Sequence, residues 1–378
     1  MGLVPAWAAL MLHILATLGC AAMLFAGWTT FWFARAAMRP PPDPAPTPVT
    51  ILKPLHGVEP RLAENLATFR DQQWGGPIQI AAGVARADDG AIPAAQSIGP
   101  ALDLAIDARR YGANAKVSNL INIMPLARED ILILSDSDIA APPDYLRRIV
   151  ATLNQPGVGV VTCPYAGRGD AGYWSRMAAA MVSYQFLPSV LLGISLGAGR
   201  ACMGSTIALR RETLNAIGGF ERFADTLADD HAIGAAVRQI GLRVAIAPVV
   251  VIHAHNDPDL RALSRHELRW MATVRDLALG GHVGSILLHA LPLALLSLAV
   301  APGPLSLALV AAAIGSRLYV AYQVDQLVGY KTLSWWLLPM RDLLSFALHI
   351  ISLGVRTVDW RGETLTIRTA GQIEAQRQ

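Results

Sequence analysis

The hydrophobic and polar positions of this chain divide it into three regions. Residues 10–33 form an apolar run almost free of charge, and after about residue 275 the chain becomes strongly apolar again. Between these ends, short apolar runs alternate with segments that have helical spacing of apolar residues. A run of about 20 apolar residues can cross a bilayer, whereas alternating strands and helices are typical of an α/β domain. The pattern therefore predicts a globular domain with membrane segments at both ends.

The central region predicts a mostly parallel sheet covered by helices, which is an α/β, Rossmann-like fold. Parallel strands are buried on both faces, so they read as continuous apolar runs. The expected strands are residues 49–55, 78–85, 131–134, 158–163, 205–209 and 244–252. The expected helices are residues 61–72, 117–127, 145–153 and 229–240.

The N-terminal apolar run is expected to be a retained membrane anchor, because it has neither a basic segment before it nor a small-residue cleavage site after it. At its C-terminal end lie Trp28, Trp32, Arg35 and Arg39. Aromatic residues at the interface and arginine beyond it place this end on the cytoplasmic side. A proline-rich stretch, residues 40–48, follows as a stiff spacer.

Three apolar segments near the C-terminus are candidates for membrane crossings. Residues 283–300 and 305–324 are joined by Ala-Pro-Gly-Pro, which predicts a tight hairpin. The third, residues 335–355, contains Arg341, Asp342 and His349. Charges within a span are costly unless they are paired or face a cavity. This segment is therefore either a span with an Arg341–Asp342 pair or a re-entrant or interfacial helix.

The tail constrains the topology further. Arg356, Arg361 and Arg368 favour the cytoplasmic side, so we expect one of the three C-terminal segments not to cross. Residues 177–196 are also apolar, and they form either a core helix or an amphipathic stretch lining a lipid entry path. The predicted parts are an anchor (1–38), a linker (39–48), an α/β domain (49–276), membrane segments (277–356) and a basic tail (357–378).

The composition agrees with a membrane-bound enzyme and excludes two other classes. The chain is 53% hydrophobic and 16% charged, whereas soluble domains have about 25% charged residues. A net charge of +3 and the lack of a basic run with interleaved aromatics argue against nucleic-acid binding. The three cysteines, Cys20, Cys163 and Cys202, are far apart and form no C-x-x-C pair, which argues against a disulfide framework or a zinc site.

The strongest chemical signal is D-S-D at Asp136–Asp138, directly after the expected strand 131–134. Ligands of open α/β sheets bind at the carboxyl ends of strands. Two carboxylates one residue apart at such an end can hold a hard divalent cation. The alternative is an acidic turn.

Two further acidic pairs follow expected strands or begin expected helices. Asp88 and Asp89 come after strand 78–85, and a carboxylate there can accept hydrogen bonds from a base or ribose, although in isolation these residues favour a D-D-G turn. Asp229 can cap the helix that it begins. Asp230 is then free to act as a general base. Capping alone is the alternative for this pair.

Basic residues accompany these acidic pairs. Lys116 either counters phosphate charge or is a surface lysine at a helix start. Arg265, His266, Arg269 and Trp270 lie on one helical segment, on which residues four apart are neighbours. Arginine suits phosphate oxygens, and the tryptophan could cover a sugar or lipid head. The alternative is a basic interfacial helix.

Taken together, these residues resemble the lipid-directed GT-A glycosyltransferases, specifically the ceramide glucosyltransferase family. Residues 52–60, L-K-P-L-H-G-V-E-P, are similar to that family's L-K-P-L-x-G-V-D-P, and N-L-A-T-F at 65–69 and K-V-S-N-L at 116–120 also match. The resemblance implies a GT-A domain and inverting transfer from a UDP-sugar to a membrane lipid, with Mg²⁺ or Mn²⁺ as cofactor.

The resemblance also implies a role for each matched residue. Asp89 would contact the nucleotide, Asp136 would lie on the donor side of the metal site, and Asp138 would bind the metal. Asp230 would be the base. Arg269 and Trp270 end a motif similar to the family's (Q/R)-x-x-R-W.

Two departures concern the acceptor. His266 stands where the family motif has Gln or Arg, and Leu187-Pro188 stands where ceramide-directed members have His-Pro. The forms H-E-L-R-W and F-L-P-S-V look more like the bacterial branch associated with hopanoid biosynthesis. That branch implies transfer of N-acetylglucosamine from UDP-GlcNAc to bacteriohopanetetrol at the cytoplasmic face of a bacterial inner membrane. The alternatives are a bacterial ceramide glucosyltransferase using UDP-glucose and, in another class, a polysaccharide synthase subunit or a non-catalytic nucleotide-binding membrane module.

Overall fold

The fold is described from a computed structural model, in which residues 6–197, 202–355, 357–360, 363–367 and 373–375 are described. The chain divides into two compact units. The α/β unit comprises Arg39–Ala166, Arg200–Asn256 and Leu365–Gln378. The helical unit comprises Met1–Met38, Gly167–Gly199 and Asp257–Thr364.

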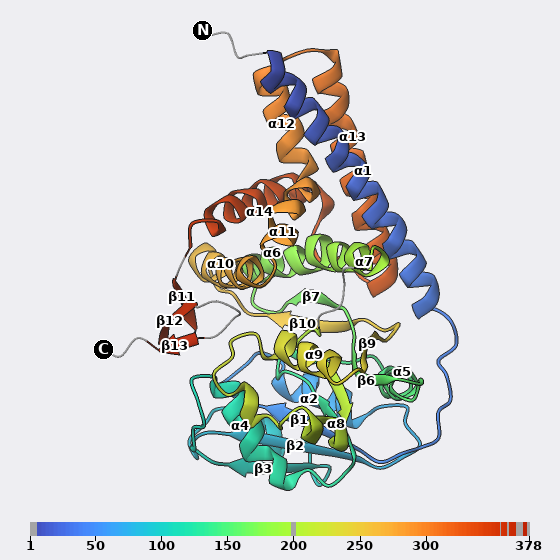
Figure 1. The fold of residues 1–378 in the computed structure, drawn as a ribbon, viewed down its shortest axis with the longest axis vertical. Helices are drawn as coiled ribbons and strands as arrows, with labels where there is room; N and C mark the ends of the chain where they lie inside the picture. Colours follow the sequence, from blue (N-terminus) through green and yellow to red (C-terminus); the bar gives the residue numbers. More distant parts are fainter. Residues whose placement is uncertain (1–5, 198–201, 356, 361–362, 368–372, 376–378) are drawn as a thin grey trace. The chain divides into compact units, whose positions relative to one another are not determined.

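The α/β unit is built on a seven-stranded sheet in the order β3-β2-β1-β4-β8-β6-β9 (Figure 1). Its strands are β1 (Val49–Pro54), β2 (Ile78–Val84), β3 (Leu102–Ile106), β4 (Ile131–Leu134), β6 (Val158–Thr162), β8 (Ile207–Arg210) and β9 (Arg243–Ile246). All neighbours pair in parallel except those of β8, which runs antiparallel to β4 and β6. The predicted mostly parallel sheet is confirmed.

Helices cover both faces of this sheet because alternate strand residues point to opposite sides. Ile51 joins a core with α2 (Leu62–Arg70), α3 (Ile92–Gln96) and α5 (Tyr145–Leu153). Its neighbour Leu52 joins the opposite core, with α4 (Ala115–Ile123), α8 (Arg211–Ala216) and α9 (Asp229–Gln239). Both residues are fully buried. Burial on both faces explains the continuous apolar strands in the sequence.

Some predicted elements differ from those observed. The expected strand 244–252 is wrong: Pro248 interrupts it, and the structure has β9 followed by a separate strand, β10 (Val251–His255). β10 belongs to a second sheet, in the order β5-β10-β7, with β5 (Ile139–Ala140) and β7 (Tyr165–Gly169). The expected helix 117–127 ends at Ile123, and a 3₁₀ turn, Met124–Leu126, follows because Pro125 cannot continue an α-helix.

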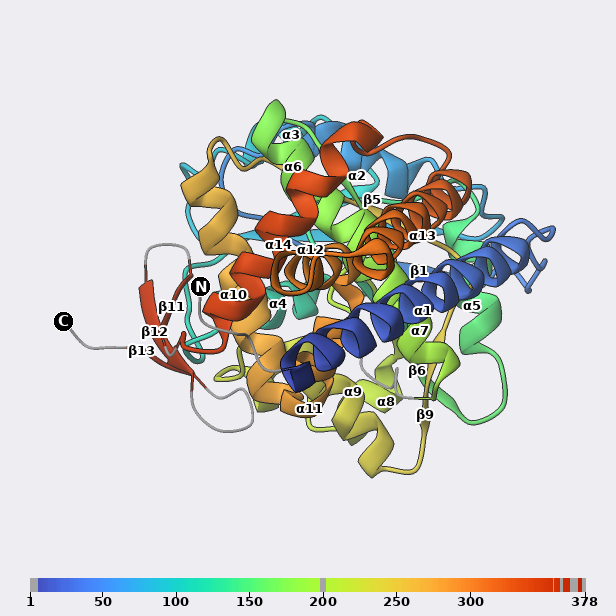
Figure 2. The same ribbon diagram turned by 90° about the horizontal axis from the view of Figure 1, so that it is seen from above.

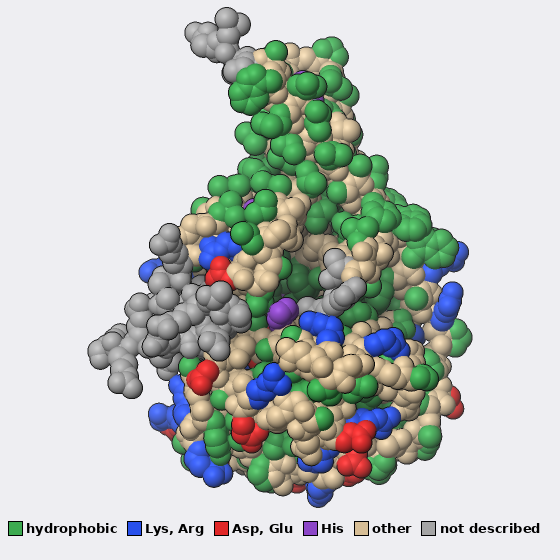
Figure 3. Space-filling view, viewed as in Figure 1, with side chains coloured by type: hydrophobic (Ala, Val, Ile, Leu, Met, Phe, Trp, Pro, Cys, Tyr) green, Lys and Arg blue, Asp and Glu red, His purple; other side chains and the backbone are tan. Residues whose placement is uncertain are grey.

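The helical unit contains three helices that are long and apolar enough to cross a membrane, among the described residues. They are α1 (Ala6–Ala37), α13 (Pro304–Val328) and the segment Tyr173–Ser195, in which α6 (Tyr173–Met181), a π-helical turn (Val182–Phe186) and α7 (Leu187–Ser195) are continuous. Figures 1 and 2 show α1 beside α13 and α12 (Ala290–Val300). Figure 3 shows that hydrophobic side chains cover the outside of these three helices. This surface suits lipid.

The remaining elements of this unit are shorter or bent. The expected crossing 283–300 is a bent pair, Leu279–Leu288 and Ala290–Val300, at an angle of 66°; its first half comprises α11 (Leu279–Gly284) and a 3₁₀ turn (Ser285–Leu288). α10 (Leu260–Leu277) precedes it, and α14 (Leu338–Ser352) follows a 3₁₀ turn, Trp335–Leu337. At 15 residues, α14 is shorter than the roughly 20 needed for a crossing.

Of the two alternatives for this segment, the one with an Arg341–Asp342 pair is wrong. The two side chains turn to different partners: Arg341 donates to Glu267 at 2.6 Å, and Asp342 accepts from Arg317 at 2.5 Å. Adjacent residues on a helix do not face each other, which explains the difference.

The chain ends in three short strands, β11 (Thr357–Trp360), β12 (Glu363–Ile367) and β13 (Ile373–Ala375), which form a small sheet. Arg356, Arg361 and Arg368, on which the expected side of the tail depends, lie outside the described residues. The tail's side of the membrane, like the four boundaries between the five predicted parts, stays a prediction.

Candidate active site

The D-S-D segment lies directly after the buried strand β4, as predicted, and a lysine of the neighbouring strand holds it. Lys53 of β1 is fully buried, and its Nζ donates to Ser135 Oγ at 3.1 Å and to the Asp136 carbonyl at 2.9 Å. The same Nζ lies 3.5 Å from the centre of the Phe69 ring. Burial lowers the pKa of Lys53 to about 7, against the opposing charge of Asp136. Lys53 therefore ties the acidic loop to β1.

Asp138 is oriented by a histidine from the second sheet. β5 begins at the next residue and pairs with β10, which brings His253 Nε2 to 3.2 Å from Asp138 Oδ2. His253 Nδ1 lies 3.0 Å from His255 Nε2. Burial alone would raise the pKa of Asp138, but the imidazole of His253 holds this pKa below its usual value. Asp138 is therefore an ionised carboxylate.

The other oxygen of Asp138 differs from the one that faces His253. Asp138 Oδ1 is buried and makes no hydrogen bond within the part of the chain that the structure describes. A buried carboxylate oxygen without a partner is costly. Such an oxygen is also the ligand type that Mg²⁺ and Mn²⁺ prefer.

Asp136 belongs to a charge cluster centred on Lys116. Lys116 Nζ lies 2.8 Å from Asp136 Oδ1 and 3.4 Å from Asp229 Oδ2. Burial would lower the pKa of Lys116, but the carboxylates of Asp136 and Asp229 raise it above its usual value. With a side chain only 15% exposed, Lys116 is no surface lysine, and that alternative is wrong. It is a fixed positive charge between two acidic motifs.

Asp229 and Asp230 begin α9, but not as predicted. The N-cap is Ala228, so the expected capping role of Asp229 is wrong; its side chain faces Lys116 instead. Asp230 Oδ1 accepts from the His231 amide at 2.7 Å. Burial and the neighbouring charge of Asp229 raise the pKa of Asp230 to about 6. A carboxylate with a raised pKa is suited to accept a proton near neutral pH.

Asp230 and Asp136 converge at Gly204. A Cβ built on this glycine would lie 3.4 Å from Asp230 Oδ2 and 3.7 Å from Asp136 Oδ2. The two carboxylates, which are 94 residues apart in the sequence, therefore border the same small space.

Asp88 and Asp89 follow β2 in a turn, as predicted. Asp89 Oδ1 accepts from the amides of Gly57 at 2.8 Å and Ala91 at 2.9 Å, and its Oδ2 lies 3.6 Å from His56 Nδ1. Asp88 pairs with Arg86 on the surface. Asp89 thus joins the loop after β1 to the loop after β2, and its contact with a nucleotide stays a prediction.

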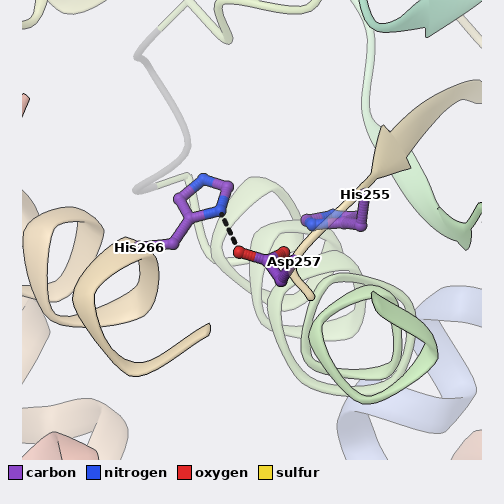
Figure 4. Close-up of side chains that lie close together, drawn as sticks. All are labelled: His255, Asp257 and His266. Carbon is purple, nitrogen blue, oxygen red and sulfur yellow. Dashed lines mark hydrogen bonds and ion pairs between the residues drawn. The ribbon is translucent and has the colours of Figure 1, made fainter. Parts of the chain in front are cut away.

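The H-E-L-R-W motif lies on α10, in the helical unit. His266 Nδ1 is 3.4 Å from Asp257 Oδ1, and its ring meets Trp270 edge-on, with centroids 4.5 Å apart. Figure 4 shows the first of these pairs. The expected proximity of His266 and Trp270 on one helix is confirmed. The roles of Arg265, His266, Arg269 and Trp270 towards a donor stay predictions.

The sequence did not predict two groups that lie beside the acidic residues of the α/β unit, Lys53 and the pair His253 and His255. Lys53 stands inside the apolar run of strand β1, and lysine is rarely buried without a partner. Its position was therefore a signal in the sequence that it holds a neighbouring polar group. The alternating H-A-H at the end of β10 placed His253 and His255 on one face of a strand. Their proximity to Asp138 depends on a two-residue strand, β5, which has no pattern of its own.

The chain is similar to known glycosyltransferases over most of its length. The sequence profile of glycosyl transferase family 21 matches residues 10–373. Ceramide glucosyltransferase 1 of Caenorhabditis elegans is 25% identical over 214 residues, which are 54% of this chain and 45% of that relative. The match therefore spans less than half the length of this curated relative.

Among solved structures, a mannosyltransferase from Pyrobaculum calidifontis, PcManGT, in complex with GDP-Man and Mn²⁺, superposes with a TM-score of 0.51. It is 22% identical, and the alignment covers 91% of this chain and 99% of that one. This likeness supports the GT-A fold. Since the family profile covers nearly all of the sequence, the chain belongs to glycosyl transferase family 21.

Proposed function

We propose that this chain is an inverting glycosyltransferase that moves a sugar from a UDP-sugar to a hydroxyl group of a membrane lipid. The observation that carries the proposal is the convergence of Asp136 and Asp230 at Gly204, beside the charge of Lys116. A donor-side carboxylate and a carboxylate with a raised pKa border one space, so a proton acceptor would lie close to a donor bound there. Family membership supports the same reaction class.

The proposed roles follow from chemistry. Asp230 takes the proton from the acceptor hydroxyl as that oxygen attacks the anomeric carbon. Lys116, held between Asp136 and Asp229, keeps the donor side of the site from becoming purely negative before the diphosphate binds. Arg269 and Trp270 are proposed to contact the pyrophosphate and the sugar.

Asp138 fits a divalent cation, Mg²⁺ or Mn²⁺, because it offers an ionised carboxylate with one buried oxygen free of hydrogen bonds among the described residues. Such a cation would offset charge on the departing UDP. Excess EDTA should abolish transfer, and Mg²⁺ or Mn²⁺ should restore it. Full activity in EDTA would remove the metal from the proposal.

The best assignment of substrates is UDP-N-acetylglucosamine and bacteriohopanetetrol, at the cytoplasmic face of a bacterial inner membrane. His266 and the H-E-L-R-W form of its motif support this branch over a ceramide acceptor. The apolar helices α1 and α13 support a membrane location.

The second candidate is transfer of glucose from UDP-glucose to ceramide. The match to a curated ceramide glucosyltransferase favours it. The two candidates share one mechanism and differ only in substrates.

The test is a matrix of both acceptors and both UDP-sugars with the purified full chain, and mass spectrometry of the lipid products. A glycosylated hopanoid formed only from UDP-GlcNAc supports the first candidate, and glucosylceramide supports the second. A polymeric product, or no transfer with any pair, would overturn lipid glycosylation in favour of a polysaccharide synthase subunit or a nucleotide-binding module.

A further inference from the structure

Helix α14 of the helical unit buries its polar side chains and exposes apolar ones, which is the opposite of a surface helix in a soluble protein. Its buried face carries Arg341, Ser345, His349 and Ser352, none more than 3% exposed. Its outward residues are apolar and largely exposed, among them Leu343, Ile350 and Ile351. Residues spaced by three and four positions share one helix face. Polar groups inside and apolar groups outside are typical of a helix that meets lipid on one side and a polar interior on the other.

Histidines from two other elements line this interior. His289 lies at the break of the bent pair Leu279–Leu288 and Ala290–Val300, where the helix is interrupted. The rings of His282 and His349 stack at 4.3 Å, and the His289 ring lies 5.1 Å from that of His349. Broken helices are tolerated at membrane depth where they line a polar cavity or a binding site.

The polar groups of this interior are only partly satisfied. Gln185 Nε2 lies 3.1 Å from His289 Nε2, and His282 Nε2 lies 2.9 Å from Ser352 Oγ. However, Gln185 Oε1, Ser345 Oγ and His349 Nε2 are buried and have no hydrogen-bond partner among the residues that the structure describes. Buried polar atoms without partners are costly, and several in one place point to an absent ligand or to water.

The chemistry of the cluster selects the ligand class. The parallel rings of His282 and His349, only 12° apart in plane, do not aim their nitrogens at a common centre, which argues against a metal. The charges of the adjacent arginines are already balanced, Arg341 by Glu267 and Arg317 by Asp342, so an anion would bring surplus negative charge into a buried place. The guanidinium groups still have buried N–H donors without a hydrogen-bond partner among the described residues, Arg341 Nε and Nη1 and Arg317 Nε, and a neutral oxygen can accept from such donors. A hydroxyl group both donates and accepts a hydrogen bond, so it suits an amide oxygen, a serine and an imidazole together.

We propose that Gln185, His289, Ser345 and His349, which we call the hydroxyl site, bind the hydroxyl-bearing head of a neutral lipid. The inference rests on the proposed function, since this lipid would be the acceptor of the transfer. A sphingoid-type diol and a polycyclic tetrol share this chemistry. The apolar outer face of α14 would contact the bilayer from which such a lipid enters.

The test uses the full chain in lipid nanodiscs and two photoactivatable, alkyne-tagged long-chain lipids, one with a diol head and one with both hydroxyls methylated. After irradiation, peptides carrying the label are mapped by mass spectrometry. We expect the diol probe to label peptides around Gln185 and His349 at least about tenfold more than its methyl ether, since the ether cannot donate. Competition with unlabelled ceramide and unlabelled bacteriohopanetetrol distinguishes the two sources.

Variants make the test specific. His349→Phe keeps an aromatic ring but removes the nitrogens, and Gln185→Leu removes the amide; both should reduce labelling by the diol probe to the level of the ether. The matched control is His13→Phe on α1, whose Nε2 is 3.0 Å from Ser306 Oγ, and it should label normally. Thermal unfolding of each variant identifies any that fail to fold, and for those Ser345→Ala is the smaller change.

Equal labelling by the two probes, or normal labelling of a folded His349→Phe variant, would overturn the hydroxyl site. Because labelling needs no glycosyl transfer, it separates this inference from the proposed function. Selective labelling without transfer would leave a lipid site and reject the enzyme assignment. Transfer without selective labelling would support the enzyme assignment and reject the hydroxyl site.

Discussion

At the residue scale, the acidic residues of the α/β unit are differentiated by their neighbours. His253 keeps Asp138 ionised, whereas burial and Asp229 raise the pKa of Asp230 to about 6. Lys116 holds Asp136 and Asp229. Two groups of one chemical type therefore have pKa values shifted in opposite directions, which is how a site separates the charge-binding role from the proton-accepting role.

Asp230→Asn tests the proton acceptor. The amide has the same shape but cannot take a proton, so we expect kcat to fall by about 10²–10⁴-fold. Binding of UDP, measured by calorimetry, should change little. Asp71→Asn is the matched control, because Asp71 is exposed and pairs with Arg70 at 2.6 Å, outside the candidate site, so the variant should keep full turnover. Normal turnover of Asp230→Asn would exclude Asp230 as the base.

The same pKa predicts the acid side of the pH profile. Asp230 accepts a proton only when ionised, so kcat should be constant well above pH 6 and fall as pH decreases through about 6. Below that value the fall should approach about tenfold per pH unit, since one group titrates. Initial rates between pH 4.5 and 8 measure this, with intrinsic fluorescence as the control for folding. A flat profile down to pH 5 would contradict the assignment.

At the element scale, the parallel strands and their helices were predictable because each has enough length for its pattern. Strand β4 and helix α5 were predicted with the observed bounds. Short or irregular elements were not predictable: β5 has two residues, and β10 follows a turn at Pro248. The position of the D-S-D carboxylates directly after β4 could therefore be predicted. The contact between Asp138 and His253 could not, because it depends on β5.

The sequence also could not predict the partner of Arg341. This partner leads to a testable prediction about the contact between α10 and α14. Arg341 is fully buried and pairs with Glu267 at 2.6 Å. Removing one partner leaves a buried charge, so Glu267→Gln or Arg341→Met alone should destabilise the chain by about 3–5 kcal/mol.

The double variant Glu267→Gln/Arg341→Met should lose less than the sum, because no charge remains unpaired. Thermal or denaturant unfolding in detergent measures the cycle. Additive losses in the double variant would show that the pair does not couple α10 to α14.

At the scale of the whole molecule, the sequence predicted apolar helices at both ends and the structure has them. It did not predict that the apolar segment 283–300 bends at His289, although Pro292 lies three residues further on and has no N–H to donate to the carbonyl of Leu288. The sequence also did not predict that the polar face of α14 is buried and its apolar face exposed. Hydropathy counts the polar residues of a segment but does not show which side of the helix faces the interior.

The manner of membrane attachment is the last prediction. α1 and α13 expose large apolar side chains, such as Trp7 at 66% and Leu305 at 58%, whereas the net charge is only +3. Attachment should thus depend on the hydrophobic effect and resist salt, although about 1 M salt shortens the Debye length to about 3 Å. Membranes from cells expressing the full chain should retain it after washing with salt or alkaline carbonate and release it only in detergent. Release by salt alone would show that charge, and not α1 and α13, holds the chain at the membrane.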